Sequence, residues 1–432
     1  MYKRQDENNI DAVIFSKADL TLNGAGTLYI AAAAGHGIVS KDDLVLTSGT
    51  YDIAAQSHGL SGKDSVRIAS STVALDTGKD GIHAENEEDT SLGFVYIADG
   101  TLSIDAQGDG ISAGTFAQLQ SGTFTIQAGG GSANASAQSD SAQEDASAKG
   151  IKAATDLILN GGTYALDCAD DGLHANGNLT VSDGVFAIAS GDDGIHADAA
   201  VVVASGAIDI SQSYEGIEGL SIDITGGTVQ LTASDDGLNA AGGNDSSGFQ
   251  GRGRDAFAAT EGAYIAISGG TVRISASGDG IDSNGDLLVS GGETYLSGPE
   301  NSGNGSLDYS GTATISGGIF AAAGSSGMAQ NFDSSSTQGV MMVTVSAGTA
   351  GSTVSLADSG GETLISWQPE KAYTCVIVSC PQMVQGGTYT LTTGGQSVDI
   401  TLSSLVYGTG HGGQPGGDQP GGGRPGGGGA RP

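Results

Sequence analysis

A six-residue motif recurs along this chain, mostly at intervals of 22 residues, and this period constrains the fold more than any other feature. The motif reads acid, glycine, aliphatic residue, polar residue and small residue, as in residues 170–175 (DDGLHA), 192–197 (DDGIHA) and 235–240 (DDGLNA). Its glycines stand at positions 37, 59, 81, 110, 150, 172, 194, 216, 237 and 280. A fixed period predicts stacked structural repeats. We expect the aliphatic residue of this acid–glycine motif to lie in the core and its glycine to form a turn.

A second motif runs in phase with the first. It reads Ser-Gly-Thr, Gly-Gly-Thr or a close variant, with glycines at positions 49, 100, 122, 162, 184, 206, 227, 270, 292 and 318. Each full repeat therefore holds three extended segments, for example 195–197, 201–203 and 208–210. The gaps contain turn-forming residues without helical periodicity. We expect an all-β fold, a parallel β-helix with three short strands per turn of about 22 residues.

The core can be predicted rung by rung, where a rung is one three-strand repeat, because side chains alternate in and out along a strand. Two inward columns follow the glycine–threonine motif: Leu102, Phe124, Tyr164, Phe186, Ile208, Val229 and Val272, then Ile104, Ile126, Leu166, Ile188, Ile210, Leu231 and Ile274. The strand before them supplies Ile97, Leu119, Leu159, Val181, Val203, Ile224 and Ile267. The acid–glycine motif supplies Ile82, Ile111, Ile151, Leu173, Ile195, Ile217, Leu238 and Ile281.

The repeat pattern also predicts the division of the chain. We expect the β-helix to span residues 1–337 and a small β-rich unit at 338–407 to cover its last rung, because an open end exposes unpaired strand. Residues 408–432 are rich in Gly and Pro and predict a flexible tail. Residues 14–20 already resemble the rung at 38–44. We therefore expect that an N-terminal cap and leader are missing, since no signal peptide or membrane span is recognised.

The charge of the chain limits the classes of molecule that it can bind. Lys and Arg number 15 against 49 Asp and Glu, a formal charge of −34, so nucleic acid and anionic membranes are excluded as partners. The excess of acid favours a cation-rich, extracellular or cell-surface setting and a monomer. Cys168 falls at an inward position and is expected to be a buried thiol. Cys375 and Cys380 are close enough in sequence to pair, but three cysteines make no disulfide framework.

The acids of the motif predict a calcium site. Neighbouring rungs lie about 4.8 Å apart, so two stacked carboxylates repel by roughly 3 to 4 kcal/mol at an effective dielectric constant of 20. A Ca²⁺ ion, which takes about 6 to 8 oxygen ligands, removes that repulsion. We expect Glu215 and Glu218 at its centre. The candidate metal ligands are Asp170, Asp171, Asp192, Asp193, Glu215, Glu218, Asp235, Asp236, Asn239, Asp279 and Asp282. The alternative is that these are solvated acids whose mutual repulsion raises their pKa values.

A second outward column stands three residues after each acid: His83, Ser112, Lys152, His174, His196, Glu218, Asn239 and Asp282. We expect His174 and His196 to be surface histidines, because no third ligand of the right type for a transition metal stands near them. The loop at residues 242–263 interrupts the repeat beside the acids, and insertions in solenoids often form the binding face. The candidate ligand-binding residues are His174, His196, Tyr214, Asn244, Asp245, Arg252, Arg254 and Arg273.

Catalysis is the alternative to binding. Polygalacturonase-like hydrolysis needs one pair of carboxylates about 5 to 9.5 Å apart. Residues 169–172 (ADDG) and 35–37 (GHG) resemble elements of those enzymes, but Asp-Asp-Gly recurs in three different rungs and the Gly-His-Gly lies several rungs away. A lyase needs an Arg or Lys base beside a Ca²⁺-bound uronate, and Arg252, Arg254 and Arg273 keep that option open. No catalytic residue is predicted.

Several longer segments resemble one family. They include residues 61–66 (SGKDSV), 213–218 (SYEGIE), 234–245 (SDDGLNAAGGND), 278–285 (GDGIDSNG), 301–305 (NSGNG) and 323–330 (AGSSGMAQ). Together they are similar to the calcium-binding, β-helical carbohydrate-binding domain proteins of cellulose-degrading bacteria, over about residues 12–400. The resemblance implies a right-handed β-helix, bound Ca²⁺, and affinity for cellulose or pectin-type polysaccharides without demonstrated cleavage.

Three functions remain open at this point. The first is a secreted or surface-attached, calcium-binding protein that binds a plant-type polysaccharide, either an acidic pectin-like glycan or cellulose, without cleaving it. An acidic face suits acidic glycans, whose carboxylates can complete a Ca²⁺ coordination shell. The second is a calcium-dependent polysaccharide lyase or hydrolase. The third is an adhesin-like stalk in which the ions only stabilise the stack.

Overall fold

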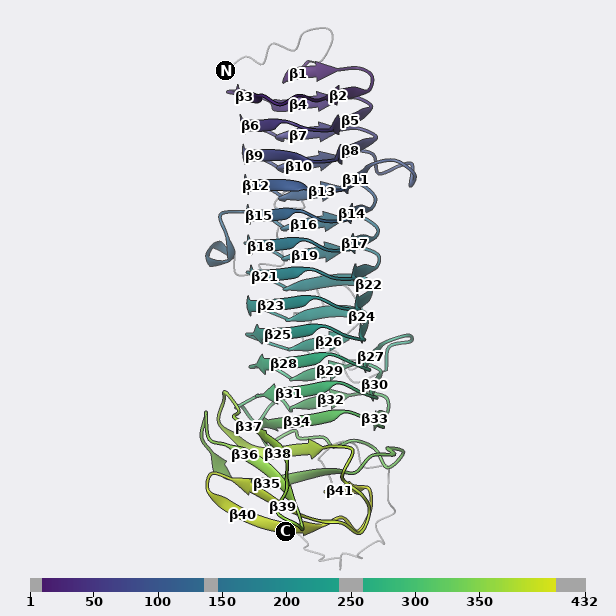
Figure 1. Ribbon diagram of the computed structural model, residues 1–432, viewed down its shortest axis with the longest axis vertical. Helices are drawn as coiled ribbons and strands as arrows, with labels where there is room; N and C mark the ends of the chain where they lie inside the picture. The colour runs from purple at the N-terminus through teal and green to yellow at the C-terminus, as the bar shows by residue number, and fades with distance from the viewer. Residues whose placement is uncertain (1–9, 136–146, 241–258, 409–432) are drawn as a thin grey trace, which may run out of the picture.

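The computed structural model describes residues 10–135, 147–240 and 259–408, and in these the chain is all-β and built mainly from stacked parallel strands (Figure 1). The rungs follow one another along the long axis, and the chain runs from one end of the stack to the other. A single short 3₁₀ helix, η1 (Ser132–Asn134), lies among the described residues. These same residues include no helix with the length and apolar character needed to span a membrane.

Each rung has three strand positions, and the strands at one position pair in parallel from rung to rung. The first position holds β1 (Ala12–Ser16), β4 (His36–Ser40), β7 (Leu60–Gly62), β10 (Ile82–Ala84), β13 (Ile111–Ala113), β16 (Ile151–Ala153), β19 (Leu173–Ala175), β22 (Ile195–Val203), β24 (Ile217–Ile224), β26 (Leu238–Ala240), β29 (Ile281–Ser283) and β32 (Leu307–Tyr309). The second position holds β2 (Leu20–Leu22), β5 (Asp43–Leu46), β8 (Ser65–Ile68), β11 (Phe94–Ile97), β14 (Ala117–Leu119), β17 (Leu157–Leu159), β20 (Leu179–Val181), β27 (Tyr264–Ile267), β30 (Asp286–Val289) and β33 (Ala313–Ile315).

The third position forms a sheet of its own. It holds β3 (Thr27–Ala32), β6 (Thr50–Ala55), β9 (Ser71–Thr77), β12 (Gly100–Ala106), β15 (Thr123–Ala128), β18 (Thr163–Cys168), β21 (Val185–Ser190), β23 (Ala207–Gln212), β25 (Thr228–Ala233), β28 (Thr271–Ala276), β31 (Glu293–Ser297) and β34 (Ile319–Gly324). These strands are consecutive neighbours in a 15-stranded sheet. The first and second positions together form a 22-stranded sheet, because β22 and β24 each run through both positions without a break.

The continuous β22 differs from the two separate strands expected at 195–197 and 201–203. Residues 198–200 read Asp-Ala-Ala, whereas the preceding rung has Asn-Gly-Asn at 176–178. With no glycine or asparagine to favour a turn there, the chain continues as an extended strand.

The predicted core is confirmed. All four predicted columns consist of buried residues, and they belong to one hydrophobic cluster. The registers align equivalent residues, so that Phe124 pairs with Tyr164 and Tyr164 with Phe186. Their rings stack with centroids 4.7 and 4.4 Å apart. Identical phase in successive rungs therefore builds continuous aromatic and aliphatic stacks inside the molecule.

The two glycine motifs have different structural causes. A Cβ added to Gly172 would lie 2.6 Å from the carbonyl oxygen of Gly194 and 2.5 Å from Cγ2 of Ile188, so the acid–glycine motif needs glycine for space. Gly172 lies in the bend between β18 and β19, as expected for a turn residue, but it has no positive φ. The positive φ belongs to the glycine–threonine motif, as at Gly184 with φ 130°.

The C-terminal strands pack against the last rung. They are β35 (Val340–Gly348), β36 (Val354–Asp358), β37 (Thr363–Trp367), β38 (Tyr373–Ser379), β39 (Thr388–Thr393), β40 (Gln396–Thr401) and β41 (Val406–Tyr407). β38 pairs antiparallel with β34 and β35, and it thereby covers the free edge of β34, the last parallel strand of the 15-stranded sheet. A separate four-stranded sheet, ordered β37-β36-β39-β40, encloses a second hydrophobic cluster. The proposed boundary at residue 338 stays a prediction.

The cysteines lie inside these packed regions. Cys168, Cys375 and Cys380 are all buried and free. Cys168 occupies the inward position predicted for it on β18, while Cys375 and Cys380 form no disulfide.

Candidate functional site

The acids of the repeated motif form one column along the edge of the stack, which we call the acid column. It consists of the residue before each motif glycine: His36, His58, Asp80, Asp109, Lys149, Asp171, Asp193, Glu215, Asp236 and Asp279. Backbone hydrogen bonds hold these positions in register, as when Gly172 N–H donates to the carbonyl of Asp193 at 2.9 Å. Beside it runs the partner column, three residues later in each rung: His83, Ser112, Lys152, His174, His196, Glu218, Asn239, Asp282 and Asp308.

One oxygen of many of these acids has a structural task. The backbone N–H of Asp193 donates to Oδ1 of Asp171 at 3.0 Å, and that of Glu215 donates to Oδ1 of Asp193 at 3.2 Å. Asp109 N–H likewise donates to Oδ1 of Asp80 at 3.0 Å. The carboxylate therefore pairs a backbone amide of the next rung that would otherwise be left unsatisfied. The other oxygen faces the partner column, where the chemistry differs from rung to rung.

In the Asp171 rung the chain supplies its own cation, Lys149. Lys149 Nζ donates to Oδ2 of Asp171 at 2.6 Å and to Oδ1 of Asp170 at 3.0 Å, and His174 Nδ1 lies 2.8 Å from Oδ2 of Asp171. Burial alone would raise the pKa of Asp171, but the charge of Lys149 and the hydrogen bond from His174 lower it below its ordinary value. Asp171 is therefore ionised and neutralised from within.

His196 sits among three carboxylates. Its Nδ1 lies 2.9 Å from Oε2 of Glu218 and 3.2 Å from Oδ2 of Asp193, and its Nε2 lies 3.2 Å from Oδ1 of Asp198. Burial would lower the pKa of His196, but these carboxylates raise it far above its usual range. We conclude that an imidazolium is the cation of this rung.

The prediction that His174 and His196 lie on the surface is wrong. Their side chains are 3% and 0% exposed, and their rings stack with centroids 4.9 Å apart. Each ring nitrogen has an oxygen partner, including Oδ1 of Asn176 at 2.9 Å from Nε2 of His174. Both were also candidates for sugar contact, and their burial within ion pairs gives them a structural role instead.

Farther along the stack, the acids stand without such cations. Asp236, Asp279 and Asp282 each present an oxygen within 4.8 Å of the others, and none of the three forms an ion pair with Lys, Arg or His among the described residues. We call these three residues the oxygen cluster. Burial, followed by the charges of neighbouring acids, raises the pKa of Asp282 to about 8. Burial is also the main cause that raises the pKa of Asp279 to about 7 and holds that of Asp236 well above its ordinary value.

Glu215 and Glu218 were expected at the centre of one calcium site, but their side chains have different partners. Glu218 contacts His196, whereas Oε2 of Glu215 accepts a hydrogen bond from Asn239 Nδ2 at 2.6 Å. Asp170, Asp171 and Asp192 bring their oxygens together in a separate group beside Lys149. The candidate ligands are thus distributed over several groups.

Of the other candidate ligand-binding residues near the acids, Tyr214 is described by the structure and four are not. Tyr214 is half-buried, and burial together with a hydrogen bond to Asp235 raises the pKa of its hydroxyl. Asn244, Asp245, Arg252 and Arg254 lie outside the described residues.

Arg273 lies on β28 in the other sheet, away from the acid column. Its guanidinium stands 4.6 Å from the ring centre of Tyr295, and both residues line a hollow of ≈ 470 Å³ together with Trp367 and Gln368. Trp367 is 8% exposed, and its buried Nε1 has no hydrogen-bond partner among the described residues. The hollow thus combines a cation and two aromatic rings.

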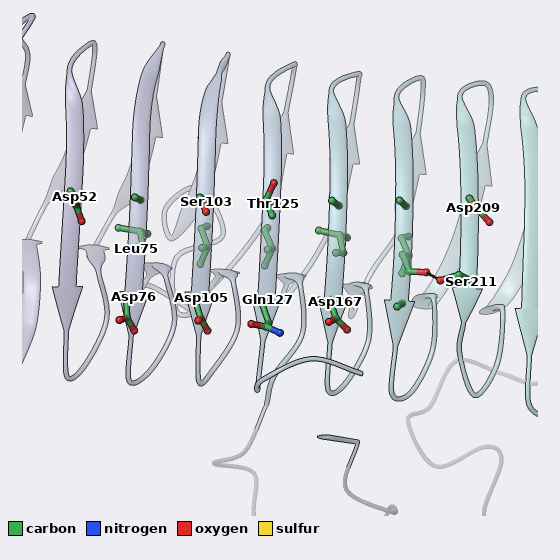
Figure 2. A pocket seen from close by; sticks show the side chains of 18 residues that line it. Asp52, Leu75, Asp76, Ser103, Asp105, Thr125, Gln127, Asp167, Asp209 and Ser211 are labelled. Carbon is green, nitrogen blue, oxygen red and sulfur yellow. Dashed lines mark hydrogen bonds between the residues drawn. The ribbon is translucent and has the colours of Figure 1, made fainter. Parts of the chain in front are cut away.

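A longer groove runs over the outer face of the 15-stranded sheet, across strands β6 to β23 (Figure 2). Its volume is ≈ 620 Å³, and small residues such as Ala74, Ala165 and Ala187 line it. Asp76, Asp105, Gln127 and Asp167 stand in one row along it, at equivalent positions of successive strands (Figure 2).

Sequence reasoning missed this groove because it followed only the inward residues of the third strand. The outward positions of the same strands repeat Ala, Ser and Thr in one column and mainly Asp in the next, which was the available signal. It also missed Lys149, which replaces the acid of the motif in one rung.

Comparison with known proteins gives one family. A family model described as carbohydrate-binding domain-containing protein matches the chain twice, over residues 1–194 and 192–404. No curated protein and no solved structure matches. The two matches lie end to end, as expected for a chain built from repeats.

Proposed function

Since the chain belongs to the family of carbohydrate-binding domain-containing proteins, we propose that it binds a linear polysaccharide in the groove on the 15-stranded sheet and holds Ca²⁺ at the oxygen cluster. The observation that carries the proposal is the groove, because it is long, open and lined by hydrogen-bonding groups at regular intervals. The function is binding without cleavage, since repeated equivalent carboxylates form no single pair of catalytic acids.

The dimensions of the groove favour a polymer. It crosses the strands β6, β9, β12, β15, β18, β21 and β23, which at about 4.8 Å per strand amounts to roughly 29 Å. A chain of sugars lying along the stack axis would meet Asp76, Asp105, Gln127 and Asp167 in succession. Their side-chain oxygens accept hydrogen bonds from sugar hydroxyls, and charged acceptors make the stronger bonds.

The charge of the groove selects between the two glycans that the sequence left open. Five aspartates line it, Asp52, Asp76, Asp105, Asp167 and Asp209, and its lining contains no Lys or Arg. An acidic glycan would place its carboxylates against these side chains, and like charges repel. We therefore propose a neutral, cellulose-type chain as its ligand.

Calcium is proposed for the oxygen cluster on the ground of chemistry. Its donors are carboxylate oxygens, which Ca²⁺ prefers, and its net negative charge lacks a counter-charge from the described residues. Asp236, Asp279 and Asp282 come from two successive rungs, so an ion there would hold those rungs together. Extracellular calcium sites bind at about 10⁻⁴ to 10⁻³ M, which suits the proposed location outside the cell.

The handedness of the stack and the oligomeric state are also proposed. Because crossovers between parallel strands are right-handed in about 98% of cases, we infer a right-handed parallel β-helix. We propose that it acts as a monomer.

A second ligand is favoured by one specific observation. The hollow at Arg273, Tyr295 and Trp367 offers a cation and aromatic faces, the pairing that suits the carboxylate and ring of a uronic acid. This hollow would bind an acidic, pectin-like glycan independently of the groove.

Binding to insoluble cellulose and to immobilised polygalacturonate, measured by depletion of the full chain from solution, tests both sites. The variant Ala165→Phe, which places a large ring in the groove, should abolish cellulose binding and leave polygalacturonate binding unchanged. Asp105→Asn should weaken cellulose binding about tenfold, since one charged hydrogen bond contributes roughly 1.5 kcal/mol. Glu261→Gln removes the same charge from an exposed site outside the groove and serves as the control.

The groove assignment is wrong if Ala165→Phe binds cellulose as the unmodified chain does. Release of soluble sugar or of unsaturated uronate during the same assay would contradict binding without cleavage.

A further inference from the structure

Three histidines stack along the N-terminal part of the column. The ring centroids of His36 and His58 lie 5.1 Å apart and those of His58 and His83 lie 4.3 Å apart, with both pairs of rings within 13° of parallel. Asp80 stands beside the last two. Its Oδ2 is 3.3 Å from Nδ1 of His58 and 2.9 Å from Nδ1 of His83. Two imidazole nitrogens and one carboxylate oxygen therefore meet at one point, all within 4.8 Å of one another.

These short distances do not correspond to well-formed hydrogen bonds. Nδ1 of His58 and Nδ1 of His83 are both buried atoms without a regular hydrogen bond among the described residues, and each has only its ion-pair distance to Oδ2 of Asp80. Buried polar atoms left unpaired are rare and need an explanation. The Asp80 carboxylate itself is held firmly, since its Oδ1 accepts the backbone N–H of Asp109 at 3.0 Å.

The Asp171 rung provides a direct internal comparison. Lys149 occupies the position of His58, Asp171 that of Asp80, and His174 that of His83, as the motif glycines 59, 81, 150 and 172 define. In that rung the Nζ of Lys149 lies 2.6 Å from the carboxylate oxygen, and the histidine forms a regular hydrogen bond to the same oxygen. A cation of the chain thus stands where, in the Asp80 rung, two imidazole nitrogens converge.

We propose that Nδ1 of His58, Nδ1 of His83 and Oδ2 of Asp80 bind a divalent transition-metal ion of the Zn²⁺ class, which takes the place that the Lys149 ammonium occupies in the Asp171 rung. Imidazole and carboxylate donors favour such ions, whereas Ca²⁺ prefers oxygen alone.

The surroundings suit an exchangeable ion. The side chains of His58, Asp80 and His83 are 13%, 16% and 26% exposed, so the cluster lies close to the surface, and a water would be the fourth ligand of the ion. His58 belongs to one rung and Asp80 and His83 belong to the next. The ion would therefore clamp two rungs together. This site is independent of the oxygen cluster, since the two share no residue.

Zinc binding by the full chain tests the proposal, measured by isothermal titration calorimetry with millimolar Ca²⁺ present to occupy oxygen-only sites. The unmodified chain should bind one Zn²⁺ at this site. His58→Lys copies the Asp171 rung, so it should fold normally and bind Zn²⁺ at least about 100-fold more weakly, because even outer-shell substitutions cost roughly 10–100-fold. His83→Gln should show a comparable loss, while the control His174→Gln should keep the zinc affinity.

Substitution with Co²⁺ gives a second readout, since its visible spectrum reports nitrogen ligation and should disappear in His58→Lys. The proposal is overturned if the unmodified chain binds no Zn²⁺, or if folded His58→Lys and His83→Gln bind it as tightly as the unmodified chain.

Discussion

Two groups of rungs place the same acid–glycine motif in opposite electrostatic states. In the Asp171 rung, Lys149 neutralises the buried carboxylate and His174 forms a hydrogen bond to it. In the rungs of Asp236 and Asp279, three carboxylates gather without a cation from the described residues. The backbone role is the same in both, since Asp171 and Asp236 each accept the N–H of the next rung through Oδ1. The acid thus has the same backbone role in both groups, whereas the chain supplies the opposite charge in the first group and, as we propose, calcium supplies it in the second.

The largest change in the free energy of unfolding is expected when the cation that the chain itself supplies, Lys149, is removed. Lys149→Met removes a nearly buried ammonium and leaves Asp171 charged, which should lower the free energy of unfolding by about 3–5 kcal/mol. Urea denaturation at pH 7 measures the change. Lys79→Met, at an exposed position, is the matched control and should shift stability by no more than about 0.5 kcal/mol. Equal effects of the two substitutions would mean that Lys149 does not neutralise the column.

The next largest change in the free energy of unfolding is expected from calcium bound from solution. Calcium at about 100 times its dissociation constant should raise the free energy of unfolding by about 2.7 kcal/mol. Asp282→Asn should be more stable than the unmodified chain in chelator, because it relieves repulsion, and less stable in calcium, because it removes a ligand. Thermal unfolding with and without calcium measures both. The same calcium gain in Asp282→Asn and in the unmodified chain would place the ion elsewhere.

A smaller effect follows from the raised pKa values of Asp279 and Asp282, about 7 and about 8. The folded state of these groups binds protons more tightly than the unfolded state, whose pKa is near 3.9. Stability in chelator should therefore fall as the pH rises from about 4 to 8. Between pH 6.5 and 7.5 we expect a loss of about 2 kcal/mol, measured by urea denaturation, and a flatter profile for Asp282→Asn. A profile that rises over this range would contradict the repulsion.

Sequence alone was sufficient for the parts of the fold that repeat. Phe124, Tyr164 and Phe186 share one phase of the period, and a parallel stack must bring them into contact. The C-terminal strands β35 to β39 also agree with the alternation of apolar residues. A period of 22 residues specifies these features because each rung repeats the environment of the one before it.

The ion pairs could not be predicted in the same way, because they depend on departures from the period. Lys149 breaks the acid column in one rung, and its effect on Asp171 depends on the direction of a long side chain. His174 and His196 look like surface residues in an outward column, yet their rings stack on one another and are buried. Glu215 and Glu218 are close in sequence but turn to different partners, Asn239 and His196.

The most direct measurement is the position of calcium in crystals grown with CaCl₂, located by anomalous scattering. The account predicts a peak about 2.3–2.6 Å from carboxylate oxygens of Asp236, Asp279 and Asp282, and no peak beside Asp171, where Lys149 already stands. A stack that shows no peak at the oxygen cluster in saturating calcium, or an equal peak at Asp171, would contradict the division of the column into internally and externally neutralised rungs.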